Sequence, residues 1–580
     1  MVYCGKPSKG CGHCRSKKVR CDGARPSCSQ CIRAKRSCPG YRDQLSLMFR
    51  DESRSVAQKV EKAAKSSSLL SKSWSPRGSP RTAYSDGSTP SELSVSADSP
   101  IFDFDSDPLH VYLMQQLSQL PLEVQTPFDP SDHEAISYFM QSNAIPGTIW
   151  VTDFMTKLAL SNDGFGSLSQ RALKSGLTAV GSAMLCRVKN VSALNAVSQK
   201  AYISALSLLN TALTDIEEAK SNQVLGAVVI LAIYELVTSR TPKDIDQWTN
   251  HILGATALLD LRGTDQLSTE TGLRLFLHLR YQIVISCIQR DARVPESVLE
   301  CAKVSMYLRP DEAHANSLII IIGKISNLRA DIKSNILTSN NDILSVASAI
   351  EMDLISWLRL LPPTYDYETR TKSAYDFKFQ QRCHGIALYD DKYHVYPNLW
   401  VSNSWSQYRC ARIILSELIL TRTLEQAKSS SSKSLSPELR LYCNSLHSTV
   451  RRLAVDICRS LPFHFRAHDD GSDGSHNTTL PPPEGYLGGL LLLWPLFLAG
   501  AVEKNGHALH TWVIRSLLII GNTMGLDQAL ALMDILGYDP SFPQEVSEAE
   551  EMELTPSVGE VEEEGVRISG NLSSFMSFKD

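Results

Sequence analysis

Six closely spaced cysteines near the start of the chain are the residues best suited to do chemistry. They begin in the stretch CGHCRSKKVRC at residues 11–21, and together they are Cys11, Cys14, Cys21, Cys28, Cys31 and Cys38. Thiolates are soft ligands that suit zinc, and a Cys-x2-Cys pair places two of them on one side of a first helical turn. A module of about 30 residues has no hydrophobic core of its own, so bound metal has to hold it together.

The spacing of these cysteines is an internal repeat. It reads C-x2-C-x6-C-x6-C-x2-C-x6-C, so the second three cysteines follow the first three at a constant offset of 17 residues. One tetrahedral zinc uses four sulfurs and leaves two idle, whereas two zincs share six sulfurs when two thiolates bridge. The simplest equivalent pair of bridges is the first cysteine of each half. We therefore predict two zinc ions, one bound by Cys11, Cys14, Cys21 and Cys28 and the other by Cys28, Cys31, Cys38 and Cys11.

Three other interpretations of the cysteines fit less well. Disulfides suit a small secreted module, but the opening residues MVYCGKPSKG contain no apolar run and predict no secretory signal. A single-zinc ribbon leaves two of the six cysteines unused. A RING-type ubiquitin-ligase module would interleave its ligands differently and include histidine, whereas His13 lies inside the first Cys-x2-Cys pair.

The cysteines lie within the most basic part of the chain. Residues 1–42 carry eleven Lys and Arg against one acid, Asp22, although the whole protein has a net charge of −4. Such a basic segment favours a nucleic acid or a membrane surface as its partner. We expect the zinc cluster to fix a short helix from Cys11 to Lys18 and to project from it a group of cations that contact double-stranded DNA: Arg15, Lys17, Lys18 and Arg20.

The run CGHCRSKKVRCDGARPSCSQCIRAKRSC resembles the fungal zinc binuclear cluster transcription factors. The match covers the cysteine spacing, the basic run after the second cysteine, the Cys-Asp at residues 21 and 22, and Pro26 between the halves. GYRDQLSLMFRDES after the sixth cysteine and LLLWPLFLAG towards the C-terminus resemble a fungal subgroup. In that subgroup a large helical region, the fungal-specific transcription factor domain, follows the cluster.

The resemblance implies that the anchored helix reads CGG-type triplets in the major groove. Lys18 matches the position that reads bases in the family, where a lysine can donate to N7 and O6 of guanine, and Lys17 assists it. Arg15 and Arg20 are expected to contact phosphates, which fix register without reading sequence. Because one triplet carries little information, we expect paired triplets and a homodimer. The implied function is a nuclear, sequence-specific transcription regulator of RNA polymerase II genes in a metabolic or secondary-metabolite pathway, and not an enzyme.

Apolar periodicity and composition predict the elements that accompany the zinc module in a mostly α chain. We expect a zinc cluster domain at 1–42, an amphipathic linker helix at 43–65, a disordered Ser/Pro-rich linker at 66–107, an all-helical regulatory domain at 108–540 and an acidic flexible tail at 541–580. The linker helix is too short for a long coiled coil. The most apolar stretch, LGGLLLLWPLFLAGAV, is shorter than the ~20 residues that span a bilayer, so we expect a buried helix and no membrane partner.

Two functional classes fit these features. The first is the DNA-binding regulator, which needs only residues already named. The second is a small-molecule sensor or enzyme in the helical domain, with the zinc cluster as a DNA-targeting device. The chain has no His-Glu-x-x-His, Gly-rich phosphate loop or nucleophile elbow, so we favour the first. Residues 545–564, with nine Glu and no base, fit a solvated tail and an activation segment for the transcription machinery equally well.

Overall fold

The structure is a computed structural model in which a small N-terminal module and a large helical domain are each defined. It describes residues 11–17, 19, 21–22, 24, 27–34, 36–39, 132–143, 159, 166–189, 191–373, 376–429, 436–467 and 485–537. The predicted linker helix at 43–65, the linker at 66–107 and the tail at 541–580 lie outside the described residues.

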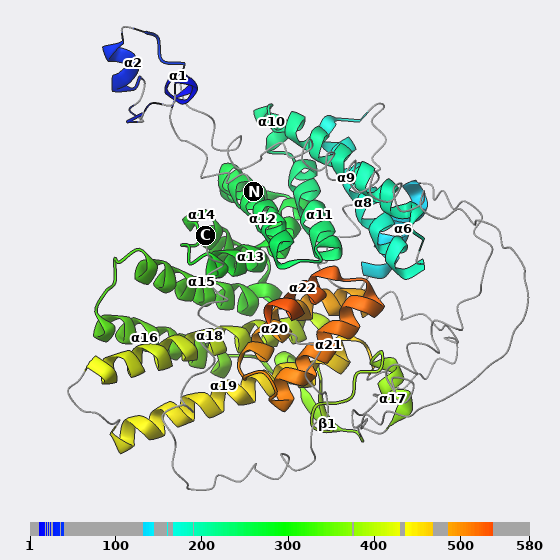
Figure 1. Ribbon diagram of the computed structural model, residues 1–580, viewed down its shortest axis with the longest axis vertical. Helices are drawn as coiled ribbons and strands as arrows, with labels where there is room; N and C mark the ends of the chain where they lie inside the picture. Colours follow the sequence, from blue (N-terminus) through cyan, green and yellow to red (C-terminus); the bar gives the residue numbers. More distant parts are fainter. Residues whose placement is uncertain are drawn as a thin grey trace, which may run out of the picture. The chain divides into compact units, whose positions relative to one another are not determined.

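The N-terminal module contains two short helices related by the sequence repeat. Helix α1 is Gly12–Ser16 and helix α2 is Ser29–Arg33, so they start 17 residues apart, as the cysteines do (Figure 1). A helix of one turn is not stable by itself in water, because its first turn fixes several residues for a single hydrogen bond. These two helices therefore depend on the cysteine cluster between them.

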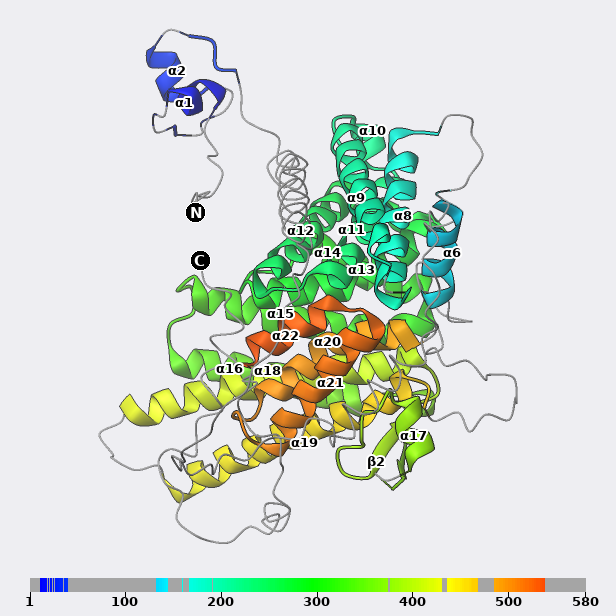
Figure 2. The ribbon, with the colours of Figure 1, turned by 45° about the vertical axis from the view of Figure 1, so that its right-hand side comes forward.

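The helical domain begins with a series of antiparallel and crossing helices. They are α6 (Asp132–Asn143), α8 (Leu168–Lys189), α9 (Ala193–Ala212), α10 (Ile216–Ala219), α11 (Asn222–Thr238), α12 (Ile245–Arg262), α13 (Glu270–Gln289), α14 (Glu296–Leu308), α15 (Ala313–Lys333) and α16 (Asn340–Arg359). Helix α11 lies at the centre of the first part, because it packs against α8, α12, α13 and α22 (Figures 1 and 2). Its residues from Val224 to Glu235 are all buried.

The second part of the domain combines long helices with a small sheet. Its elements are β1 (Glu368–Thr371), α17 (Phe377–Arg382), β2 (Lys392–Val395), α18 (Leu399–Ser429), α19 (Pro437–His464), α20 (Gly485–Ala501), α21 (Ala508–Met524) and α22 (Asp527–Ile535). The strands pair antiparallel, with Glu368 opposite Val395 and Thr371 opposite Lys392. The prediction of a mostly helical chain is confirmed, and the structure adds this two-stranded sheet, which the sequence did not reveal.

Local sequence signals set several helix boundaries. The hydroxyls of Ser221, Ser339 and Ser436 each accept a hydrogen bond from the backbone N–H three residues further on, at the starts of α11, α16 and α19. These contacts satisfy N–H groups that have no partner inside the helix. At the other end, α21 stops at Gly525, whose φ of 69° lies in the left-handed region that favours glycine.

Helix α20 forms the apolar centre of the second part. It packs against α18, α19, α21 and α22, and it contains Pro495 within its length (Figure 2). The predicted buried helix is therefore confirmed. In the part of the chain that the structure describes, no helix combines the length and the apolar character needed to cross a membrane.

One glycine brings two helices of this core close together. A Cβ atom on Gly488 in α20 would lie 1.9 Å from the carbonyl oxygen of His464, at the end of α19. Backbone atoms cannot yield as a side chain can, so this approach requires glycine. By contrast, a Cβ atom on Gly323 in α15 would meet only side-chain methyl groups, the nearest at 3.1 Å.

Candidate metal centre and nucleic-acid interface

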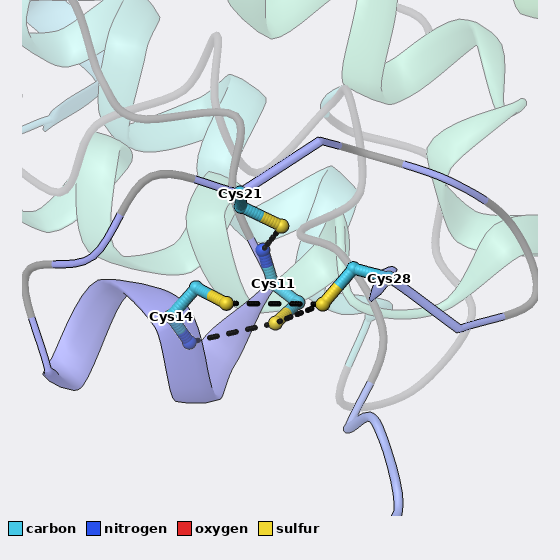
Figure 3. A group of neighbouring side chains, drawn as sticks. All are labelled: Cys11, Cys14, Cys21 and Cys28. Atoms are coloured by element: carbon cyan, nitrogen blue, oxygen red, sulfur yellow. Dashed lines mark hydrogen bonds between the residues drawn. The ribbon is translucent and has the colours of Figure 1, made fainter. Parts of the chain in front are cut away.

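The two short helices position the cysteines in equivalent ways. The backbone N–H of Cys14 donates to Sγ of Cys11 at 3.4 Å (Figure 3). In the second half, the backbone N–H of Cys31 donates to Sγ of Cys28 at 3.4 Å. The first cysteine of each half thus receives an N–H donor from the first turn of its own helix. Such donors stabilise negative charge on sulfur, which suits the two thiolates that are predicted to bridge the metal ions.

The six sulfurs form two groups of four that overlap. Within each group all Sγ atoms lie within 4.8 Å of one another, and the groups are Cys11, Cys14, Cys21 and Cys28, and Cys11, Cys28, Cys31 and Cys38. The shared members are those that the repeat predicts as bridges.

The distances between sulfurs fit zinc. The Sγ atom of Cys28 lies 3.6 Å from that of Cys11 and 3.7 Å from that of Cys14, and Cys11 lies 3.7 Å from Cys31. A tetrahedral zinc with bonds of about 2.3 Å needs its sulfurs about 3.8 Å apart. A disulfide needs about 2.05 Å, and no cysteine in the described residues takes part in a disulfide. The disulfide interpretation is therefore excluded.

Burial makes these thiols dependent on a cation. Cys11, Cys14, Cys28 and Cys31 are at most 4% exposed. Burial and the neighbouring thiols raise the pKa of Cys14 and raise that of Cys31 to about 12. A raised pKa favours the protonated thiol, whereas zinc binds the thiolate, so zinc binding to these cysteines is coupled to the release of protons.

A carboxylate links the two halves of the module, which the sequence did not reveal. The backbone N–H of Ser29, at the start of α2, lies 3.2 Å from both oxygens of Asp22, and the Ser29 hydroxyl donates to Oδ2 at 2.5 Å. These bonds lower the pKa of Asp22. The sequence signal for this contact was the position of the two residues, because Asp22 and Ser29 each directly follow a cysteine of the cluster, Cys21 and Cys28.

The predicted DNA contacts lie next to this cluster in the chain. Arg15 belongs to α1, and Lys17 follows that helix with an exposed side chain. Lys18, Arg20 and the side chain of Arg15 lie outside the described residues. In the second half Arg33 and Arg36 are exposed. The structure thus shows cations on both halves but does not describe the full predicted set.

A zinc-cysteine module joined to a large helical domain defines a class, the zinc cluster regulators. The family model described as the fungal Zn(2)-Cys(6) binuclear cluster domain matches residues 9–47. The model described as the fungal specific transcription factor domain matches residues 151–522, more than half of the chain. The chain therefore belongs to the family of fungal transcription factors with these two domains. Members of this family are transcription factors, not enzymes, and the zinc cluster domain binds DNA.

One curated relative matches about a third of the chain. Transcription factor dbaG of Emericella nidulans is 27% identical over 191 residues, which are 32% of this chain and 41% of the relative. The match therefore spans less than half of the relative's length. No solved structure matches the chain. Membership of a transcription factor family implies a function in the nucleus.

Proposed function

We propose that this protein is a nuclear, sequence-specific DNA-binding regulator of RNA polymerase II genes. The observation that carries the proposal is the pair of four-sulfur groups that share Cys11 and Cys28. Cys11 immediately precedes α1 in the sequence. Two bound zinc ions make this helix a rigid base for the cations that follow it. The pathway is metabolic or secondary-metabolite in character, as the family resemblance suggests.

The proposed ligands of the two zinc ions are the six cysteines of the shared arrangement, with Cys11 and Cys28 as bridges. Lys18 is proposed to read guanine in CGG-type triplets, and Lys17 to assist it. Arg15 and Arg20 are assigned to phosphates. The protein acts as a homodimer on paired triplets, and its acidic tail contacts the transcription machinery.

DNA binding by the full-length, zinc-loaded protein tests the assignment of Lys18. The Lys18→Ala variant should lose about 1–3 kcal/mol of binding free energy on a duplex with paired CGG triplets, and much less on a scrambled duplex. Arg15→Ala is the matched control, because loss of a phosphate contact weakens both duplexes alike and lowers the salt dependence by about one contact. Equal losses on both duplexes for Lys18→Ala would remove the base-reading role.

A further inference from the structure

The start of α18 is buried although its side chains are polar. Ser402, Asn403, Ser404, Ser406, Gln407 and Arg409 are each at most 5% exposed. This part of the domain is enclosed by the neighbouring helices α15, α16, α19 and α20, which all pack against α18. Burial of polar groups is unfavourable unless each finds a partner, so the partners of these side chains indicate what this region does.

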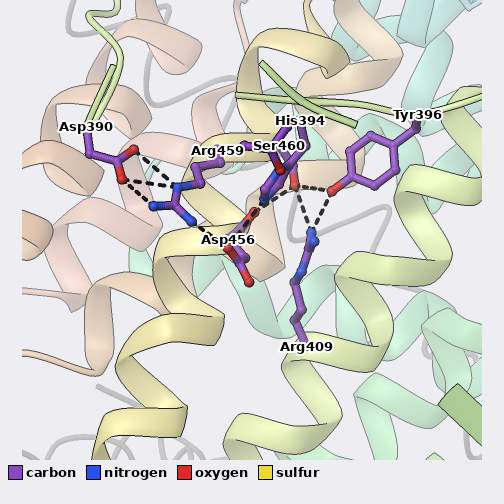
Figure 4. A network of polar contacts seen from close by, with 8 residues as sticks. Asp390, His394, Tyr396, Arg409, Asp456, Arg459 and Ser460 are labelled. Atoms are coloured by element: carbon purple, nitrogen blue, oxygen red, sulfur yellow. Dashed lines mark hydrogen bonds and ion pairs between the residues drawn. The ribbon is translucent and has the colours of Figure 1, made fainter. Parts of the chain in front are cut away.

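Arg409 is the one charged side chain among these six buried residues, so its burial is the most unfavourable without partners. The residue is 1% exposed. Nη1 donates to the hydroxyl of Tyr396 at 2.7 Å and to Oγ of Ser460 at 2.9 Å (Figure 4). The charge also lies over three aromatic rings, at 5.3 Å from Tyr367, 5.5 Å from Trp405 and 5.9 Å from Tyr396. All of these contacts are neutral groups.

No described carboxylate forms an ion pair with Arg409. Asp456, an acid that interacts electrostatically with Arg409, is already paired with His394 at 3.4 Å and with Arg459 at 3.0 Å. Arg459 is in turn paired with Asp390 through both of its carboxylate oxygens (Figure 4). The neighbouring acids are therefore committed to other cations, and Arg409 lacks an anion at contact distance.

The second terminal nitrogen of Arg409 also lacks a hydrogen-bond acceptor. Its Nη2 atom is buried and has no partner among the described residues. Arg280, the other buried arginine among the described residues, also has one terminal nitrogen, Nη1, without a partner. It differs from Arg409 in having a carboxylate partner, because its Nη2 donates to Glu312 at 2.6 Å. A buried guanidinium with neutral contacts on one nitrogen and none on the other can take an acceptor that also carries negative charge.

We propose that Arg409 anchors a small carboxylate ligand inside the helical domain, with Nη2 donating to a carboxylate oxygen. The aromatic rings of Tyr367, Tyr396 and Trp405 enclose the guanidinium and keep its charge away from water, which strengthens such a bond. The ligand would act as an effector, a role that goes beyond DNA recognition and does not depend on it.

The test uses the full-length, zinc-loaded protein with sodium acetate and sodium formate, the smallest carboxylates. At tenfold excess over Kd, acetate should raise the Tm of the helical domain by about 2 °C. Acetamide, which has the same shape without the charge, and sodium chloride at equal ionic strength should leave Tm unchanged. No response to either carboxylate, or an equal response to acetamide, would overturn the proposal.

Two substitutions on the same helix locate the site. Arg409→Met should abolish the acetate response, whereas Arg412→Met should retain it, because Arg412 is paired with Glu351 at 3.2 Å. A response that survives in Arg409→Met overturns the assignment. If that variant does not fold, Arg409→Lys replaces it, and its acetate affinity, measured by calorimetry, should fall at least about tenfold because an ammonium cannot reproduce the planar donor pair. Unchanged affinity in Arg409→Lys would also refute the proposal.

Discussion

Removal of single cysteines distinguishes shared sulfurs from terminal ones. Cys28→Ala takes one sulfur from both four-sulfur groups, whereas Cys14→Ala takes one from a single group. Structural zinc contributes about 10–16 kcal/mol in small modules, which over four sulfurs is about 3–4 kcal/mol each, or about a hundred- to a thousand-fold in affinity. At a free zinc concentration about tenfold above the wild-type Kd, a site that has lost one sulfur is therefore almost empty.

The assay is the zinc content of the full-length protein after equilibration in a zinc-buffered solution. The wild type should retain two zinc ions per chain, Cys14→Ala about one, and Cys28→Ala almost none. Cys443→Ala is the matched control, because Cys443 is a buried free thiol in α19, and this variant should keep both ions. Equal zinc contents in Cys14→Ala and Cys28→Ala, or a single ion in the wild type, would refute the shared arrangement.

Three further predictions concern other contacts. Asp22→Asn weakens the hydrogen bond to Ser29 that links the two halves of the zinc module, so it should lower the zinc affinity about tenfold in a chelator competition. An unchanged zinc affinity would contradict this linking role of Asp22. Gly488→Ala should lower the free energy of unfolding by about 1–3 kcal/mol, measured by thermal unfolding, because its Cβ atom would meet the backbone of His464. Gly323→Ala is the control and should leave the stability unchanged or raise it. Similar effects of the two substitutions would be evidence against the close approach of Gly488 to His464. Burial raises the pKa of Glu417 to about 8, so the folded protein holds this proton more tightly than the unfolded chain does. The stability gained from this proton is lost as the pH rises from about 4.3, the ordinary pKa of Glu, to about 8. Glu417→Gln should therefore raise Tm more at pH 8 than at pH 6, and an equal rise at both would refute the assignment.

The zinc module was predictable from sequence because its information is local. The metal ligands repeat at fixed spacing, and thiolates and zinc fix both stoichiometry and geometry. The same holds for the helices, since apolar residues every three or four positions identify the buried face of elements such as α16 and α19. The DNA contacts remain predictions, because Lys18 and Arg20 lie outside the described residues. The domain boundaries also remain predictions, because the segments that separate the domains lie outside the described residues.

The features that the sequence concealed depend on tertiary contacts. Strands β1 and β2 have four residues each, and every residue of β1 is exposed, so neither shows the alternation that identifies a strand. The stretch SNSWSQYR at the start of α18 is polar and is typical of a surface, yet the helices packed around it bury it. Arg409, the last residue of this stretch, has partners outside α18: Tyr396 lies 13 residues before it and Ser460 lies 51 residues after it, so only the fold reveals them.

The overlap of the two four-sulfur groups has a consequence for how the module fills with zinc. Binding of a first ion brings Cys11 and Cys28 together, and these are two of the four sulfurs that the second ion needs. The second ion thus encounters a partly assembled site and loses less chain entropy on binding, which makes loading cooperative. In the wild type, chains with a single ion are then less common at equilibrium than two independent sites would give, and the fraction of the regulator able to bind DNA rises more steeply with free zinc.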